Sequence, residues 1–253
     1  MKRAAVRGAR VTLYYLSWLI FGVAGLALNL ACIPLLLLPK RERCAPAVRA
    51  VIRFLFDGWV RWLGASGVIR VKLKGFEEGA LPGRTVYVAN HPSVVDATIL
   101  LARLPDAVCI FKPALMRNPA IGPAAIMAGY VSGDAGLDLL RAVAAKVADG
   151  RSALVFPEGT RTAQGVNLGR MKAGFALIAD RAQASVQLVI LRSSPGIGAR
   201  GRPWWRAPAM LPAWFEATMD RNWPYVPGRP AAELTEVVER RILEVLASLE
   251  PSA

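Results

Sequence analysis

The sequence predicts an α/β fold in which a mostly parallel central sheet is flanked by helices, preceded by an N-terminal hydrophobic helical segment that anchors the chain to a membrane. After Gly67, apolar runs of strand length alternate with helical patterns, which is typical of parallel α/β sheets. Before that point, an uncharged stretch covers residues 11–38. We therefore expect residues 1–64 to form membrane-anchoring helices and residues 65–253 to form one α/β domain.

The uncharged stretch is long enough to enter a bilayer. As a helix it would run about 42 Å, more than the roughly 30 Å of a hydrocarbon core. Basic residues flank both ends, so the positive-inside rule gives little indication of orientation. Asn29 and Pro34 permit a bend, which leaves spanning and re-entry both open. A cleaved signal peptide is disfavoured because the stretch is too long and no small-residue cleavage site follows it.

Residues 46–64 form a second helical candidate. Apolar side chains recur there every three or four positions, and charged side chains recur on another face at Arg49, Arg53, Asp57 and Arg61. This pattern suits a helix that lies in a membrane interface, or an ordinary surface helix packed on the core.

The remaining elements follow in alternation. We expect strands at residues 69–74, 85–89, 107–111, 153–156 and 186–191, and helices at 92–104, 120–128, 137–148 and 171–181. Further on, we expect a packed strand pair within residues 207–218, an extended segment at 222–230 and a closing helix at 233–249.

Composition narrows the class of partner. Lys+Arg 32 against Asp+Glu 18 gives a net charge of +14, which indicates a polyanionic partner such as nucleic acid, anionic lipid headgroups or phosphorylated substrates. Cys32, Cys44 and Cys109 show no paired spacing, which is typical of thiols in a reducing compartment. Because the chain has one histidine and no cysteine cluster, we expect no metal site.

The segment Asn90-His91-Pro92-Ser93-Val94-Val95-Asp96 follows an expected strand and holds the only histidine. Histidine is the side chain that ordinarily titrates near neutral pH, so proton transfer by a histidine must use His91. Residues five apart on a helix lie about 140° apart, so His91 and Asp96 can meet only across a bend, which Pro92 supplies in a first helical turn. Asp96 would then hold one ring nitrogen. By itself, the segment is equally compatible with a structural histidine.

A second candidate site follows the strand expected at residues 153–156. Gly159 allows a close approach to a ligand, Arg161 offers donors suited to phosphate, and Glu158 can bond ligand hydroxyls or brace the arginine. Ligands of parallel sheets gather at the carboxyl ends of strands, where this loop and the His91 turn both lie. A surface turn with a solvated arginine is the alternative.

Together, these motifs resemble two sequence blocks of the glycerolipid acyltransferase family, which makes phosphatidic acid from lysophosphatidic acid. The blocks are Asn90 to Ser93 with Asp96, and Phe156-Pro157-Glu158-Gly159-Thr160-Arg161. A further block is recognisable in Lys112, Leu115, Pro119 and Gly122. Two departures are a missing arginine, where the chain has Tyr130-Val131-Ser132-Gly133-Asp134, and a missing proline in residues 185–189.

The resemblance implies a role for each matched residue. His91, oriented by Asp96, would take the proton from an acceptor hydroxyl as that oxygen attacks the thioester of acyl-CoA or acyl carrier protein. Glu158, Gly159, Thr160, Arg161, Lys112 and Arg117 would bind substrate. The acceptor would be a lysophospholipid such as 1-acylglycerol-3-phosphate, and the donor thioester would be a co-substrate rather than a bound cofactor.

The resemblance also implies partners and a location. We expect membrane lipids and an acyl thioester as partners, no nucleic acid, and a catalytic domain on the cytoplasmic face of a bacterial-type inner membrane. Two alternatives remain. One is an acyltransferase for a different acceptor, such as an ornithine-type lipid, a glycolipid or a polyene- or polyketide-like lipid. The other is a non-catalytic, basic, membrane-bound lipid-binding protein.

Two other patterns in the sequence have different explanations. Gly196-Ile197-Gly198-Ala199-Arg200-Gly201 matches a dinucleotide-binding pattern, but Arg202-Pro203-Trp204-Trp205 follows it and is a poor start for a helix. We expect a glycine loop near the site instead. The tryptophans and arginines of residues 200–214 form a membrane-interface patch or a packed strand pair.

Overall fold

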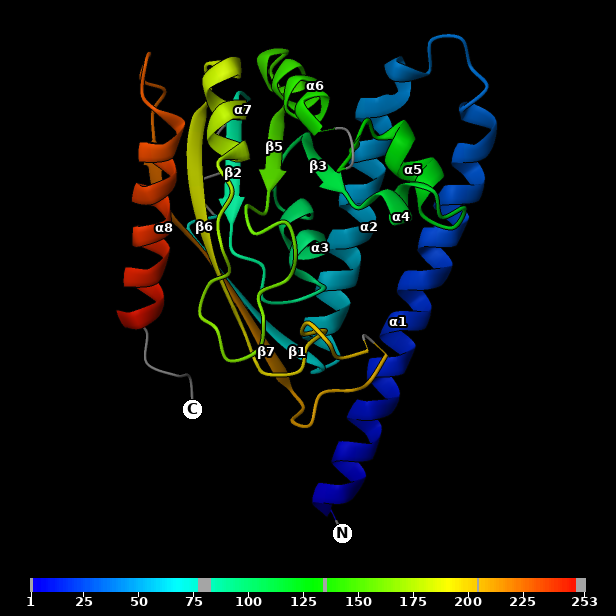
Figure 1. The fold of residues 1–253 in the computed structure, drawn as a ribbon. Helices are drawn as coiled ribbons and strands as arrows, with labels where there is room; N and C mark the ends of the chain where they lie inside the picture. The colour runs from blue at the N-terminus through cyan, green and yellow to red at the C-terminus, as the bar shows by residue number, and fades with distance from the viewer. Residues whose placement is uncertain (1, 77–82, 134–135, 204, 249–253) are drawn as a thin grey trace.

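The computed structural model describes residues 2–76, 83–133, 136–203 and 205–248 (Figure 1). The helices are α1 (Lys2–Leu35), the short η1 (Arg41–Cys44), α2 (Ala45–Ala65), α3 (Asp96–Leu101), α4 (Pro113–Met116), α5 (Gly122–Met127), α6 (Gly136–Ala148), α7 (Gly174–Ala182) and α8 (Ala231–Ser248). The strands are β1 (Ile69–Lys74), β2 (Thr85–Ala89), β3 (Ala107–Phe111), β4 (Val131–Ser132), β5 (Ser152–Val155), β6 (Ser185–Ser193) and β7 (Ala213–Trp223).

The strands form a seven-stranded mixed sheet in the described residues, with the order β1-β7-β6-β2-β5-β3-β4. Strands β6, β2, β5, β3 and β4 run parallel to one another, whereas β7 pairs antiparallel with β6 and parallel with β1. Strand β2 lies at the centre and is buried along its whole length. The carboxyl ends of β5 and β6 therefore lie on either side of the carboxyl end of β2.

Helices cover both faces of the sheet (Figure 1). Helices α6, α7 and α8 pack in a row on one face, and α2, α3 and α5 form a layer on the other, as right-handed crossovers require. One apolar cluster runs from α1 and α2 through the sheet to α8. The predicted mostly parallel α/β fold is confirmed.

Helix α1 packs against α2 and α5 along one side only. The indole of Trp59 donates to the Ser17 carbonyl oxygen at 2.8 Å, and the Ala124 amide donates to Asn29 Oδ1 at 2.9 Å. The opposite side exposes large apolar residues, including Leu19 (63% exposed) and Val23 (60% exposed). By length and composition, Ala5–Leu35 is the one helix in the described part of the chain that could cross a membrane. Only 17% of its most apolar stretch is buried, unlike a core helix.

Several expected elements are placed differently in the structure. Residues 92–95 form a turn and α3 begins at Asp96, because the Asp96 carboxylate accepts the Ser93 amide and holds this segment out of the helix. In place of a strand pair within residues 207–218, one strand, β7, continues to Trp223. The sequence analysis did not predict α4 or β4, which are four and two residues long.

Candidate active site

The turn after β2 is fixed to both neighbouring strands. The Asn90 side chain is buried and bridges to β6, donating to the Leu191 carbonyl oxygen at 2.8 Å and accepting the Leu191 amide at 2.7 Å. On the other side, the His91 carbonyl oxygen accepts the Thr162 amide at 2.8 Å. The backbone of His91 is therefore held at the carboxyl edge of the sheet, as the sequence predicts.

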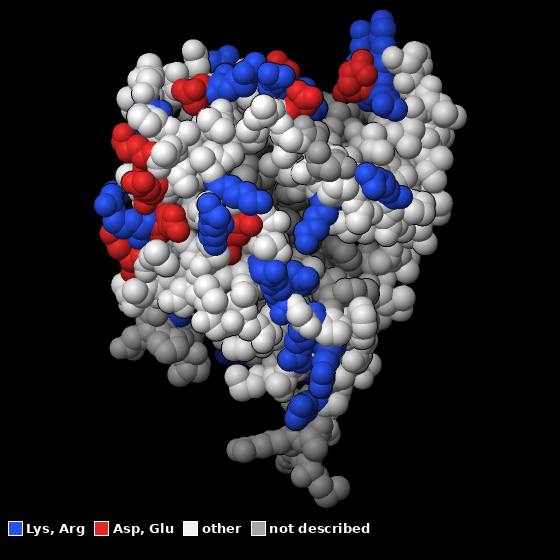
Figure 2. All heavy atoms as spheres, viewed as in Figure 1, with Lys and Arg blue, Asp and Glu red and all other residues white. Residues whose placement is uncertain are grey.

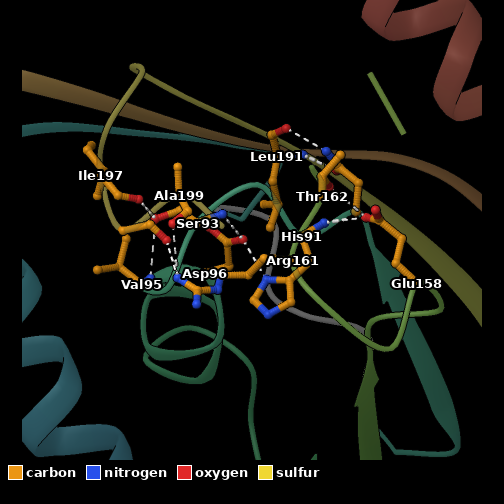
Figure 3. Close-up of polar contacts among 12 residues, drawn as sticks. His91, Ser93, Val95, Asp96, Glu158, Arg161, Thr162, Leu191, Ile197 and Ala199 are labelled. Carbon is orange, nitrogen blue, oxygen red and sulfur yellow. Dashed lines mark hydrogen bonds and ion pairs between the residues drawn. The ribbon is translucent and has the colours of Figure 1, made fainter. Parts of the chain in front are cut away.

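His91 and Asp96 meet across the turn (Figure 3). The distance from His91 Nδ1 to Asp96 Oδ2 is 2.8 Å, and the same oxygen accepts the Ser93 amide at 2.7 Å. Asp96 is fully buried, and this burial raises the pKa of its carboxyl group, while the hydrogen bond to His91 opposes that rise. The prediction that Asp96 holds one ring nitrogen is confirmed.

The imidazole keeps its other nitrogen open. The His91 ring stacks on Phe156, with the ring centroids 4.1 Å apart and an interplanar angle of 19°. Its side chain is 19% exposed, and no partner for Nε2 occurs among the described residues. An imidazole fixed at Nδ1, with Nε2 accessible, can accept a proton from a bound hydroxyl group.

Glu158 makes contacts that the sequence did not predict. Its Oε1 accepts the His91 amide at 2.9 Å and the Thr162 hydroxyl at 2.9 Å, and its Oε2 accepts the Gly169 amide at 2.8 Å. The carboxylate is buried, and these three contacts are to groups of the protein. Glu158 fixes the main chain of the catalytic histidine candidate (Figure 3).

Arg161 connects this site to the glycine loop at residues 196–201. Its Nη1 donates to the carbonyl oxygens of Gly198, at 2.5 Å, and Ala199, at 3.4 Å. The buried Ser93 hydroxyl donates to the Ile197 carbonyl oxygen at 2.6 Å. Gly198 has a φ of +52°, and a Cβ there would collide with Val94 in the His91 turn. The dinucleotide-like pattern is thus a loop packed on the candidate active site.

A cavity of about 570 Å³ opens beside the Glu158 loop. Its lining includes Thr160 and Arg161 of the Glu158 loop and Lys172, which lies just before α7. Arg200 of the glycine loop also lines it. Gly159 has a φ of +67°, and a Cβ there would lie 3.2 Å from Lys172 Nζ. Glycine at this position therefore leaves room for the lysine ammonium group.

The comparisons with known proteins agree with this geometry. Residues 70–192 match the family described as Acyltransferase. A 1-acyl-sn-glycerol-3-phosphate acyltransferase of Helicobacter pylori (strain J99) is 32% identical over 135 residues, which is 51% of this chain. Over these residues the chain is similar to the glycerolipid acyltransferase family. It spans about half the length of this curated relative, 55%.

A solved structure shares the fold of this chain. The crystal structure of the 1-acyl-sn-glycerophosphate (LPA) acyltransferase PlsC from Thermotoga maritima superposes with a TM-score of 0.73. The match covers 96% of this chain and 98% of that chain at 20% identity. The agreement includes the long N-terminal segment, because it extends over nearly the whole of both chains.

The remaining predicted site residues lie elsewhere in the structure. Lys112 caps α4 and Arg117 ends it, and both side chains are exposed. Neither lines the cavity beside Glu158 in the described part of the chain. Asp134, which ends the segment in which the expected arginine is missing, lies outside the described residues, as does Trp204.

Sequence reasoning missed several contributors to the candidate site. Asn90, Phe156 and Ser93 were part of the quoted motifs, but nothing in their spacing indicated which partner each would contact. Arg200 lies in the glycine loop, and its approach to the cavity depends on how that loop folds back. A basic residue next to three glycines was the only available signal. Among the described residues, no group of three or more His, Cys, Asp or Glu side chains could hold a metal ion.

Proposed function

We propose that this protein transfers a fatty acyl chain from a thioester to the hydroxyl group of a lysophospholipid such as 1-acylglycerol-3-phosphate. The observation that carries the proposal is the 2.8 Å contact between His91 Nδ1 and a fully buried Asp96, which leaves Nε2 accessible. The match of residues 70–192 to the family described as Acyltransferase, and the relative named 1-acyl-sn-glycerol-3-phosphate acyltransferase, support the same chemistry.

The chemistry needs one base and no protein nucleophile. His91 Nε2 takes the proton of the acceptor hydroxyl as the hydroxyl oxygen forms a bond to the thioester carbonyl carbon. The tetrahedral intermediate collapses when the carbon–sulfur bond breaks, and the imidazolium returns its proton to the departing thiolate. The products are an ester and a free thiol. Asp96 stabilises the transient positive charge on His91 and keeps Nδ1 protonated.

The binding roles follow from charge. Arg161 lies beside the His91 turn and offers a guanidinium group that suits the acceptor phosphate. Thr160 lines the cavity, and Gly159 directly precedes it in the same loop, so both remain proposed substrate contacts. Lys112 and Arg117, which are exposed on α4, remain proposed contacts for a charged headgroup.

The lipid acceptor also suggests how the protein associates with a membrane. The outward side of α1 presents apolar side chains along its length, and we place this side in the lipid. The three cysteines are free thiols, which fits a catalytic domain in a reducing compartment such as the bacterial cytoplasm. The cytoplasmic face of the inner membrane is part of this proposal.

A different acceptor is the second candidate. The segment Tyr130-Val131-Ser132-Gly133-Asp134 lacks the arginine that usually ends the family's second block, which favours an acceptor with another headgroup unless Arg117, Arg170 or Lys172 takes its place. Acyl transfer to a glycolipid, an ornithine-type lipid or a polyene- or polyketide-like lipid would use His91 as the base in the same way. Either acyl-CoA or acyl carrier protein would serve as donor and leave no bound cofactor.

An acceptor screen tests both candidates. The purified full chain in detergent would be given labelled acyl-CoA or acyl carrier protein and a panel of lyso-lipids, and the products identified by mass spectrometry. We expect transfer to 1-acylglycerol-3-phosphate and its loss in His91→Ala. A well-folded His91→Ala variant with unchanged transfer would contradict the mechanism. A wild-type chain that acylates no lipid but binds them would favour the non-catalytic alternative.

A further inference from the structure

A second cavity lies between α2 and the segment that joins α3 to β3. Its volume is about 500 Å³, within the range of roughly 300–1,000 Å³ that is usual for small-molecule sites. Figure 2 shows basic side chains gathered along the middle of the active-site face, over the segments that follow β5 and β6. The second cavity shares no lining residue with the cavity beside Glu158, and it has charged residues of its own. They are four arginines and two aspartates, namely Arg49, Arg53, Arg61, Arg103, Asp57 and Asp106.

The second cavity lies at the edge of the sheet opposite to His91. Ala107, in its lining, begins β3 and pairs with Ser152 at the amino end of β5, whereas His91 follows the carboxyl end of β2. A strand of five residues, such as β2, separates the two edges by roughly 13 Å. In 1-acylglycerol-3-phosphate the phosphate is on the carbon next to the reacting hydroxyl. A ligand in the second cavity is therefore not the reacting acceptor.

The aspartates of the lining are already paired with arginines. Asp106 Oδ1 lies 2.6 Å from Arg49 Nε. Asp57 binds two arginines, with Oδ1 2.8 Å from Arg103 Nη1 and Oδ2 2.7 Å from Arg61 Nε. The lining residues have a net charge of 4 − 2 = +2. A ligand with two negative charges would neutralise this excess.

The buried arginine has a donor nitrogen to spare. Arg49 is only 5% exposed, and its Nε donates to Asp106 while its Nη1 donates to the Ala128 carbonyl oxygen at 2.7 Å. Its Nη2 is buried and has no hydrogen-bond partner in the described residues, and the same holds for Nε of Arg103. Because buried donors are almost always hydrogen-bonded, these two nitrogens indicate that the cavity takes a ligand rich in acceptors.

Two further donors of the lining are available to such a ligand. Arg53 Nε donates to the Ala102 carbonyl oxygen at 3.4 Å, and its two terminal nitrogens have no partner among the described residues. The Tyr130 hydroxyl also has no hydrogen-bond partner in the described part of the chain. Burial raises the pKa of Tyr130, so its hydroxyl group keeps its proton and can donate it.

A phosphate monoester matches both the charge and the donors. It carries about two negative charges at pH 7 and offers three acceptor oxygens. Arginine donors bind phosphate with short, charge-assisted hydrogen bonds. Phe54, also in the lining, is 76% exposed and gives the entrance an apolar side that an acyl chain of a lipid would cover.

We propose that the second cavity is a non-catalytic binding site for a phosphate monoester group, carried by a lipid or by a water-soluble molecule. Arg53 and Tyr130 are among its donors. The ligand would join α2, which supplies Arg49 and Arg53, to the α3–β3 connection, which supplies Arg103. The site does not depend on the proposed acyl transfer.

Binding of glycerol 3-phosphate tests the site. The full chain in detergent would be titrated by calorimetry with glycerol 3-phosphate, and with glycerol and sodium chloride at equal ionic strength as controls. We expect saturable binding of glycerol 3-phosphate only. Arg53→Gln and Tyr130→Phe should each weaken this binding about tenfold, because each removes a hydrogen bond to a charged group. Arg181→Gln, an exposed arginine on α7, is the matched control and should bind like the wild type.

The variant Arg161→Gln separates this site from the cavity beside Glu158. Binding that persists in Arg161→Gln and falls about tenfold when Arg53→Gln is added belongs to the second cavity. Binding that is the same in Arg161→Gln with and without Arg53→Gln would place the ligand elsewhere and overturn the inference. So would a wild type that binds glycerol 3-phosphate no better than glycerol.

Short-chain lipids identify which molecule carries the phosphate. Dihexanoyl phosphatidate that binds at least tenfold more tightly than glycerol 3-phosphate, with this advantage lost in Phe54→Ser, would identify a lipid headgroup. Equal binding of the two would identify a water-soluble phosphate monoester. Dihexanoyl phosphatidylcholine, a zwitterionic phosphodiester, should bind at least tenfold more weakly than either. If it bound as tightly as the phosphate monoesters, the site would recognise lipid in general and the inference would be wrong.

Activity and stability measurements check that the site is separate from catalysis. Acyl transfer by Arg53→Gln, assayed without added phosphate monoester other than the substrate, should keep kcat and both KM values within about twofold of the wild type. A rise in the KM for the lyso-lipid alone would make the cavity part of the acceptor site and would contradict the proposal. Because the ligand joins α2 to the rest of the domain, glycerol 3-phosphate should raise the Tm of the wild type more than that of Arg53→Gln.

Discussion

Replacing Glu158 distinguishes a carboxylate that positions His91 from one that contacts substrate. In the structure, Glu158 accepts hydrogen bonds from His91 N, Thr162 Oγ1 and Gly169 N, all between 2.8 and 2.9 Å. Glu158→Ala leaves two buried or half-buried main-chain amides without this partner. At about 1–3 kcal/mol for each unpaired group, the free energy of unfolding should fall by about 2–6 kcal/mol. A typical domain stability of about 5–15 kcal/mol allows this variant to remain folded.

Glu158→Ala should lower the rate of catalysis because the His91 imidazole is no longer held in position. Without Glu158, the His91 backbone keeps only its bond from Thr162 N on this side, so the imidazole is free to shift. A displacement of about 1 Å costs roughly 10²-fold in rate, so kcat should fall about 100-fold with little change in the KM of either substrate. Glu158→Gln retains an oxygen for His91 and Thr162 and loses only the Gly169 bond. Its kcat should stay within about tenfold of the wild type.

Comparing Glu158→Ala with Glu158→Gln tests whether Glu158 positions His91 or contacts substrate. The assay is steady-state acyl transfer at saturating donor and acceptor, with chemical denaturation as the stability measurement. Thr162→Val is the matched control, because it removes the Thr162 hydroxyl bond to Glu158 and keeps the Thr162 amide bond to His91. If Glu158→Gln were as damaging as Glu158→Ala, or if either acted mainly through KM, Glu158 would have to contact substrate and the positioning argument would be refuted.

Three further predictions follow from the same structure. Asp96→Asn should lower kcat about 10³- to 10⁴-fold in a folded protein. Burial raises the pKa of Asp96 above its ordinary 3.8, so on acidification the wild-type enzyme should lose activity at a higher pH than it would with an unperturbed aspartate. The pH–rate profiles of the wild type and the variant check both points. Arg241→Gln should lower the free energy of unfolding by about 1 kcal/mol at pH 7, because Arg241 makes two 2.7 Å hydrogen bonds to Asp220. The Arg241 hydrogen bond lowers the pKa of Asp220, so this stabilisation is present above about pH 4 and is lost as the pH falls through the lowered pKa. Urea unfolding at several pH values should show that loss only in the wild type. Gly198→Ala should destabilise the fold by about 1–3 kcal/mol, because Gly198 has a positive φ, and should lower kcat, because the new Cβ displaces Val94. Gly201 also has a positive φ, but a Cβ there meets no atom within 4 Å, so Gly201→Ala should be destabilised without losing kcat. Urea unfolding and steady-state kinetics of the two variants check this difference.

Local sequence patterns correctly predicted much of the fold. The strands at residues 69–74, 85–89 and 107–111 have the predicted bounds, because short apolar runs between turn residues specify buried strands. The order of strands was not predictable in the same way. Strand β7 inserts between β1 and β6, and this pairing depends on contacts between residues more than 100 positions apart, such as Ile69 with Ala213.

The candidate site likewise has features that the sequence specifies and features that only the tertiary structure specifies. The sequence alone determined that His91 is the available base and that Asp96, five residues on, can reach it only across a bend, because composition and local geometry leave no other arrangement. Only the tertiary structure decided that Glu158 accepts the His91 amide, and that the glycine loop packs on Val94 and brings Arg200 to the cavity. Those positions depend on how three strand-end loops pack against one another, and no local pattern in any one loop specifies the partners supplied by the other two.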